Sequence, residues 1–135
     1  MKLREYLLSL DGTSIFGDQI EYDPDVNLLL EQGKIFSGNK AFVDMQANGC
    51  HWNVTYLFEQ GSIDQIVIGY AMNPQGVWFQ HTWGIKDDII VETSEVNFFH
   101  IKTYFGVVLD DPLSFVELCN NNPKGSGKVR RVKRS

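Results

Sequence analysis

The second half of the chain alternates between apolar segments and turn signals, and this pattern limits the possible folds more than any other feature. The sequence Asn73-Pro74-Gln75-Gly76 is a strong turn signal, and residues 86–88 form a second tight turn. The segments around these turns alternate in polarity or are rich in β-branched residues, as strands are. Connections this short join antiparallel neighbours. The sequence therefore predicts an antiparallel sheet with strands over residues 63–72, 77–85, 89–93 and 104–109.

Helical patterns come before these strands. Residues 2–10 and 25–32 have apolar side chains at helical spacing. Residues 51–60 place Val54, Leu57 and Phe58 on one face and are followed by Gly61, a common residue at helix C-termini. We therefore expect an α+β fold in which a central helix, with a cysteine at its N-terminus, packs on the antiparallel sheet.

The length and composition fit one folded domain. The chain has 135 residues, of which 43% are hydrophobic and 13% aromatic, so it can form a substantial core. We expect a single domain over residues 1–119. Residues 120–135 have no periodicity and almost no apolar side chains, so they are expected to form a flexible basic tail.

Charge is distributed unevenly between the domain and the tail. All 17 acidic residues lie at or before Glu117, and six of the 12 basic residues lie at or after Lys124. Residues 1–123 therefore carry a net charge of −11 (six basic minus 17 acidic), whereas the remainder carries +6. An acidic body argues against a nucleic-acid reader. The basic segment 124–134 is either a solvated extension or a contact for nucleic acid or an acidic protein surface.

The sequence contains no recognised signal peptide or membrane span. Its N-terminal segment has a basic start but only a short, broken apolar run and no small-residue cleavage pattern. No window approaches about 18 uninterrupted apolar residues, so no membrane partner is expected. Cys50 and Cys119 are too few for a disulfide scaffold, although they could form one bridge. A cytoplasmic, reducing location is the default expectation.

Cys50 stands where the Asn48-Gly49 turn enters the predicted central helix. A catalytic cysteine reacts as the thiolate, and the N–H groups and dipole of a helix N-terminus stabilise negative charge. The same N–H groups could hold an oxyanion. The alternative interpretation is a small buried apolar side chain, which is what most free cysteines are.

His81 lies in the middle of a predicted strand and is a candidate base for Cys50. If Lys86-Asp87 is the two-residue turn of the hairpin, His81 stands directly opposite Glu92, whose carboxylate would orient the imidazole. If the turn is shifted, Ser94 stands opposite His81 instead. Other residues compete for these roles: Asp88 and Glu95 for the carboxylate, and His51 and His100 for the base.

Two segments, NGCHWNVTYLFEQG and VIGYAMNPQGVWFQHTWGIKDDIIVETS, together resemble the core of the transglutaminase-like and papain-like cysteine-hydrolase superfamily. In that superfamily a cysteine opens a helix, the next strands supply a His in an H-x-W context, and an Asp or Asn follows before Thr. The matching residues here are Cys50 with Asn53, His81-Thr82-Trp83 and Val91-Glu92-Thr93. The later YFGV resembles a closing strand of small bacterial and phage members. Glu92 departs from the usual Asp or Asn by one methylene.

The resemblance implies a catalytic site of Cys50, His81 and Glu92 that acts on a peptide or another amide. The oxyanion-hole or substrate-binding candidates are Gln46, Asn48, Trp52 and Trp83. Metal-ligand and phosphate-binding spacings do not occur, so no metal or cofactor is predicted.

Two functions fit these patterns. The first is a thiol-dependent hydrolase or acyltransferase of the peptidase, amidase, deamidase or transglutaminase type. The second is a non-catalytic interaction protein on the same scaffold, such as a phage or bacterial accessory protein whose basic tail contacts nucleic acid or an acidic partner.

Overall fold

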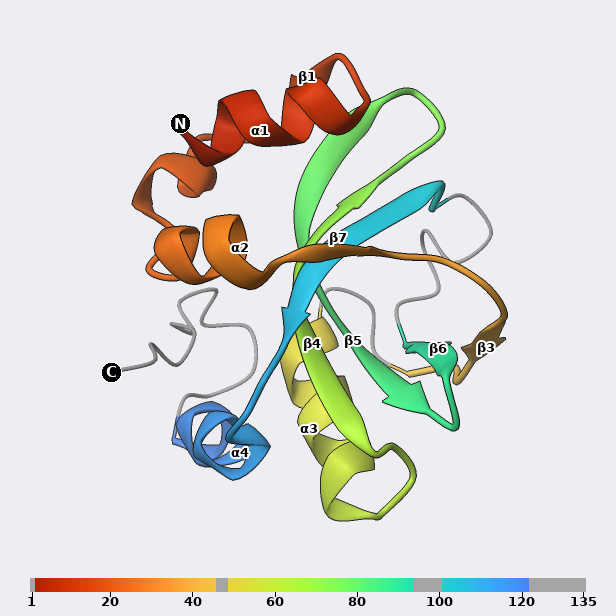
Figure 1. The fold of residues 1–135 in the computed structure, drawn as a ribbon. Coiled ribbons are helices and arrows are strands. Elements are labelled where there is room, and N and C mark those ends of the chain that lie inside the picture. The colour runs from red at the N-terminus through yellow and green to blue at the C-terminus, as the bar shows by residue number, and fades with distance from the viewer. Residues whose placement is uncertain (1, 46–48, 94–100, 122–135) are drawn as a thin grey trace.

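The computed structural model describes residues 2–45, 49–93 and 101–121, and it consists of helices packed on a curled sheet (Figure 1). The helices are α1 (Leu3–Leu10), the short 3-10 helix η1 (Gln19–Tyr22), α2 (Val26–Gln32), α3 (Cys50–Glu59) and α4 (Pro112–Asn120). The strands are β1 (Ser14–Ile15), β2 (Lys34–Phe36), β3 (Lys40–Phe42), β4 (Gln65–Met72), β5 (Val77–Lys86), β6 (Ile89–Glu92) and β7 (Thr103–Val108). The predicted α+β class, with Cys50 opening a helix that packs on the sheet, is confirmed. None of the described helices is long and apolar enough to cross a membrane.

The described strands form one mixed sheet in the order β2-β7-β4-β5-β6-β3, and β1 pairs with β5. The four strands predicted from sequence form its antiparallel centre, β7-β4-β5-β6. At the margins, β3 runs parallel to β6, and β1 runs parallel to β5. The expectation of a purely antiparallel sheet is therefore wrong at these two places. Both parallel strands come from the N-terminal third of the chain, and their partners are distant in sequence, so no local turn signal reports their direction.

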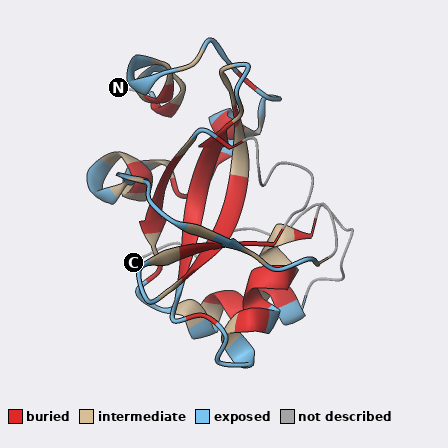
Figure 2. Ribbon diagram, turned by 90° about the vertical axis from the view of Figure 1, so that its right-hand side faces the viewer, coloured by how far each residue is buried: buried red, intermediate tan, exposed pale blue. Residues whose placement is uncertain are grey.

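Both faces of the sheet are buried, but by different means (Figure 2). One face packs against all four α-helices in a cluster that includes Leu7, Leu29, Val54 and Phe115. The cluster on the other face contains strand and loop residues: Val67, Ala71, Trp83, Ile85, Ile90, Ile101 and Tyr104. The chain between β2 and β3 crosses this second face (Figure 1), where Phe36 packs edge-on against Trp83 with ring centroids 5.7 Å apart. His81 lies on this second face, stacked on Trp83.

Some elements do not follow from the sequence patterns. The strands β2 and β3 have only three residues each, which is too short to show a periodicity. Residues 38–44 show neither clear helical spacing nor clear strand alternation. Helix α4 has start signals that could have predicted it, because Asp111 caps the backbone N–H of Ser114 at 3.2 Å and Pro112 follows Asp111. This helix runs through Asn120, one residue into the expected tail. The rest of the basic tail, from residue 122, lies outside the described residues.

The β5–β6 hairpin has the shifted register. Its pairs are Gly84–Val91, Ile85–Ile90 and Lys86–Ile89, so Asp87-Asp88 is the two-residue turn. Both aspartates have positive φ angles, 50° and 65°, as a type I′ turn requires. The interpretation with Lys86-Asp87 as the turn is therefore wrong, because lysine is less suited than aspartate to the left-handed conformation. In this register the next position after the Gly84–Val91 pair sets Glu92 opposite Trp83. Trp83 and His81 are two residues apart on the same strand face, so Glu92 is diagonal to His81.

Replacing Gly69 with alanine is expected to destabilise the sheet beside His81. Gly69 is the β4 partner of His81, and an added Cβ would lie 2.0 Å from the carbonyl oxygen of Phe105. We expect the free energy of unfolding to fall by about 3 kcal/mol in urea denaturation, because the β4 and β7 backbones would have to separate. Gly61→Ala is the control: its site has no atom within 4 Å and a φ of +75°, so only the backbone cost of about 1 kcal/mol should appear. Equal losses in the two variants would contradict the close approach.

Candidate active site

Cys50 is half-buried and is the first residue of α3, preceded by Gly49 at the N-cap. The N–H groups in the first turn of a helix have no partner within that helix. A Ser, Thr, Asp or Asn at the N-cap would bond to one of them, but glycine has no side chain to do so. The local sequence thus leaves the positive end of α3 beside a thiol.

Two side-chain contacts fix the first turn of α3. His51 Nδ1 lies 2.7 Å from the hydroxyl of Thr82 on β5, and the indole N–H of Trp52 donates to the carbonyl of Cys119 on α4 at 3.0 Å. The start of the helix is therefore held from the sheet on one side and from α4 on the other, which fixes where the Cys50 thiol lies.

The edge of β5 is interrupted where Cys50 approaches it. On that edge β1 pairs with Val77 and Trp78, and β6 pairs with residues 84–86. Between these two segments, no strand in the described part of the chain occupies the edge. Here Cys50 lies within reach of the backbone N–H of Thr82 and of the His81 side chain, and hydrogen bonding with both lowers the pKa of its thiol. The gap lets a residue on the helical side of the sheet meet an imidazole on the other side.

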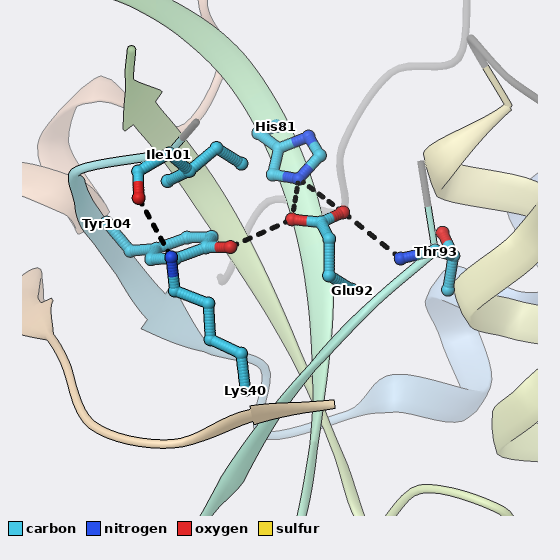
Figure 3. A network of polar contacts seen from close by, with 6 residues as sticks. All are labelled: Lys40, His81, Glu92, Thr93, Ile101 and Tyr104. Carbon is cyan, nitrogen blue, oxygen red and sulfur yellow. Dashed lines mark hydrogen bonds and ion pairs between the residues drawn. The ribbon is translucent and has the colours of Figure 1, made fainter. Parts of the chain in front are cut away.

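His81 forms a close buried pair with Glu92 (Figure 3). Its Nε2 lies 2.7 Å from Oε1 and 2.9 Å from Oε2, and the two residues are only 4% and 0% exposed. Because Nε2 faces the carboxylate, Nδ1 is the nitrogen left for Cys50, and Figure 3 shows it pointing away from Glu92. Residues that are diagonal across two strands lie about 7–8 Å apart, with their Cβ atoms somewhat closer, against about 5 Å for the Cβ atoms of directly opposed residues. The additional methylene of a glutamate suits this longer span.

Further donors hold the carboxylate of Glu92. The hydroxyl of Tyr104 on β7 donates to Oε1 at 2.9 Å, and the backbone N–H of Thr93 donates to Oε2 at 3.1 Å (Figure 3). Lys40 on β3 places its ammonium 5.1 Å from the centre of the Tyr104 ring and donates to the carbonyl of Ile101 at 2.8 Å. The carboxylate thus accepts hydrogen bonds on both oxygens, and the Lys40 cation lies nearby.

These contacts set the protonation states of the site. Burial alone would raise the pKa of Cys50, but the hydrogen bond and charge of His81 and the N–H of Thr82 hold the pKa of this thiol below its ordinary value. Burial alone would lower the pKa of His81, but the charge of Glu92 and the hydrogen bonds with Cys50 and Glu92 raise this pKa to about 10. Both shifts favour a thiolate beside an imidazolium over a neutral thiol beside a neutral imidazole. The pKa of Tyr104 is raised, by burial first and then by Glu92, so its hydroxyl remains a donor.

The structure brings together the three residues expected to form the site, Cys50, His81 and Glu92, and it places the other candidates as follows. Trp83 is fully buried beneath His81, with ring centroids 6.0 Å apart, so it supports the imidazole and does not line a cleft. The N–H of Trp52 points into the α3–α4 contact and not toward an oxyanion. Gln46 and Asn48 lie outside the described residues.

The competing residues fall elsewhere. His51 is bonded to Thr82 and packs against Phe115, with ring centroids 5.7 Å apart, so it anchors α3 and is not placed as the base. Asp88 is exposed in the hairpin turn. Glu95 and His100 lie outside the described residues. Within the part of the chain that is described, no group of three or more His, Cys, Asp or Glu side chains is arranged to hold a metal ion.

Sequence reasoning missed Tyr104, Lys40 and the N–H of Thr82. Tyr104 stood in a predicted strand, and its alternation could have placed it on one sheet face, but nothing in the sequence indicates that β7 lies on the far side of β4 from His81. Lys40 belongs to a strand that was not predicted. The role of Thr82 depends on the gap in the β5 edge, which no local pattern reports.

No protein-family model, curated protein or solved structure matches this chain. The resemblance to the cysteine-hydrolase superfamily therefore stays a prediction, and function has to be inferred from the geometry of the site.

Tyr104→Phe is expected to slow the alkylation of Cys50 by iodoacetamide at about pH 6 by roughly tenfold. The variant removes a hydrogen bond to the buried carboxylate, so the ionised form of Glu92 is less well stabilised. A less stable carboxylate charge stabilises the His81 imidazolium less, and the pKa of the Cys50 thiol therefore rises. The measurement is the pH dependence of the alkylation rate.

Tyr70→Phe is the matched control. Its hydroxyl donates to another buried carboxylate, that of Asp23, at 2.5 Å on the helical face of the sheet. This variant should leave the alkylation profile of Cys50 unchanged. A profile that shifts equally in both variants would mean that the effect comes from general loosening of the sheet.

Proposed function

We propose that this protein is a thiol-dependent hydrolase or acyltransferase that uses Cys50 as nucleophile, His81 as acid and base, and Glu92 as the group that orients and charges His81. The observation that carries the proposal is the buried His81–Glu92 pair, because a pair this close keeps an imidazolium beside the sulfur. A structural histidine would need only one neutral hydrogen-bond partner. A buried ionised carboxylate costs far more, and its occurrence beside a thiol at a helix N-terminus favours a catalytic role.

In the proposed reaction, the Cys50 thiolate attacks the acyl carbon of an amide or ester and forms a C–S bond and a tetrahedral oxyanion. The oxyanion then collapses, the bond to the leaving group breaks, and the His81 imidazolium gives its Nδ1 proton to the departing amine or alkoxide. Neutral His81 next removes a proton from water or an acceptor amine, which attacks the thioester. This proton transfer restores the His81 imidazolium, and collapse of the second intermediate breaks the C–S bond, restores the Cys50 thiolate and releases the acyl product.

The first turn of α3 is the proposed oxyanion site. Its backbone N–H groups stand next to the sulfur, and Gly49 has no side chain to occupy them. Hydrogen bonds from fixed backbone groups need no reorganisation as the charge develops. The substrate class is a peptide or another amide, in agreement with the pattern in the sequence, and a reducing compartment would keep Cys50 active.

Cys50 is expected to react with iodoacetamide at about pH 6 at least a hundredfold faster than Cys119 in the folded protein. Burial raises the pKa of Cys119 to about 12, whereas the pKa of Cys50 is lowered, so Cys50 should supply far more thiolate than Cys119 at this pH. The measurement is mass spectrometry of peptides after timed labelling. His81→Ala should remove most of the difference between the labelling rates of the two thiols. Equal, slow labelling of both thiols in the wild-type protein would contradict the proposal.

The imidazole of His81 is expected to remain protonated until the pH approaches about 10, as followed by NMR of a sample with 15N-labelled histidine. Its pKa is raised above the ordinary value, so the charged state should persist through neutral pH and be lost only as the pH rises through the higher value. Glu92→Gln should lower this pKa because the carboxylate charge is removed while the shape is kept. Titration of wild-type His81 near its ordinary pKa of about 6.5 would show that the charged pair does not form.

A further inference from the structure

A hollow lies at the start of β5, on the strand face that carries His81. Its lining residues are Phe16, Asn73, Val77 and Phe79, and its volume is about 270 Å³. This volume is just below the range of about 300–1,000 Å³ for sites that hold whole drug-sized ligands, so the hollow has room for one large side chain. Of the described residues that line it, three are apolar and none is charged, so its chemistry suits an apolar group better than a lysine or an aspartate.

The hollow adjoins His81 through a shared wall. Phe79 precedes His81 by two residues on the same strand face, and its ring packs edge-on against the imidazole with centroids 5.5 Å apart. A strand rises by about 3.3 Å per residue, so Phe79, the lining residue nearest to His81 along β5, stands about 7 Å from it. One to two residues of an extended substrate span that distance.

Phe16 places the hollow along the same edge of β5 that Cys50 approaches. Its backbone N–H donates to the carbonyl of Trp78 at 2.8 Å, which continues the pairing of β1 with this edge. The Phe16 side chain is nevertheless 77% exposed. A large ring left in water beside an apolar hollow gains from a ligand that covers it, because burial of apolar surface is favourable.

We propose that this hollow is a specificity subsite that binds a large apolar side chain, aromatic or branched aliphatic, of the acyl donor. The side chain belongs to a residue at the attacked carbonyl or to the residue next to it. This inference rests on the proposed function, since the subsite is defined by its position next to His81, the proposed acid and base.

The test uses two series of chloromethyl ketones, N-acetyl-X and N-acetyl-X-glycyl, with X as Phe, Leu, Asp or Lys. The Cys50 thiolate displaces chloride from these probes, and the rate for each probe is divided by the iodoacetamide rate of the same variant. In at least one series, the Phe and Leu probes should react about tenfold faster than the Asp and Lys probes. Rates that do not depend on X in both series, with Cys50 still reactive toward iodoacetamide, would overturn the subsite and leave the proposed function standing.

Variants of the lining locate the preference. Phe16→Ser changes an exposed side chain and should reduce the apolar preference at least threefold, and Val77→Asp should favour the Lys probe. Tyr22→Ser is the matched control, because Tyr22 is 80% exposed and does not line the hollow, so it should keep the wild-type preference. A preference that survives both lining variants would place specificity elsewhere. A Cys50 that fails to react selectively with iodoacetamide would overturn both the proposed function and the subsite.

Discussion

The buried carboxylate of Glu92 is the constraint on which the rest of the site depends. An ionised group with no exposed surface costs several kcal/mol unless donors and opposite charge surround it. Its donors come from different elements: the imidazole from β5, the hydroxyl of Tyr104 from β7, and the N–H of Thr93 from the end of β6. Three strands must therefore be in place before the charge can be buried. The ammonium of Lys40, from β3, supplies further positive charge near the carboxylate.

The carboxylate acts on the thiol only through the imidazole between them. By itself, the negative charge of Glu92 would raise the pKa of Cys50, because two anions repel each other. With His81 between them, the same charge stabilises the imidazolium, and the imidazolium in turn stabilises the thiolate. The order carboxylate, imidazolium, thiolate alternates in sign, so each ionised group favours the next.

The interrupted edge of β5 makes this order possible in a sheet whose helices all pack on one face. α3 belongs to the helical face, whereas His81 and Glu92 point to the other. A continuous partner strand would separate the thiol from the imidazole. Because β1 and β6 leave the middle of the edge open, the N-terminus of α3 reaches the N–H of Thr82 and the ring of His81. The same edge carries Phe16 and the hollow next to Phe79.

The sequence by itself determined the elements whose signals are local. The turns, the alternation of β4 and β5, and Gly61 after the central helix define the helix that Cys50 opens and the strand that carries His81, since each depends on residues close together in the chain. Only the tertiary structure decided the parallel pairing of β1 and β3 and the positions of Tyr104 and Lys40, because these depend on contacts between distant segments. It also decided how Glu92 reaches His81. The Asp87-Asp88 turn shifts the hairpin by two in register, and the longer side chain of glutamate then spans a diagonal that the sequence could not distinguish from a direct pair.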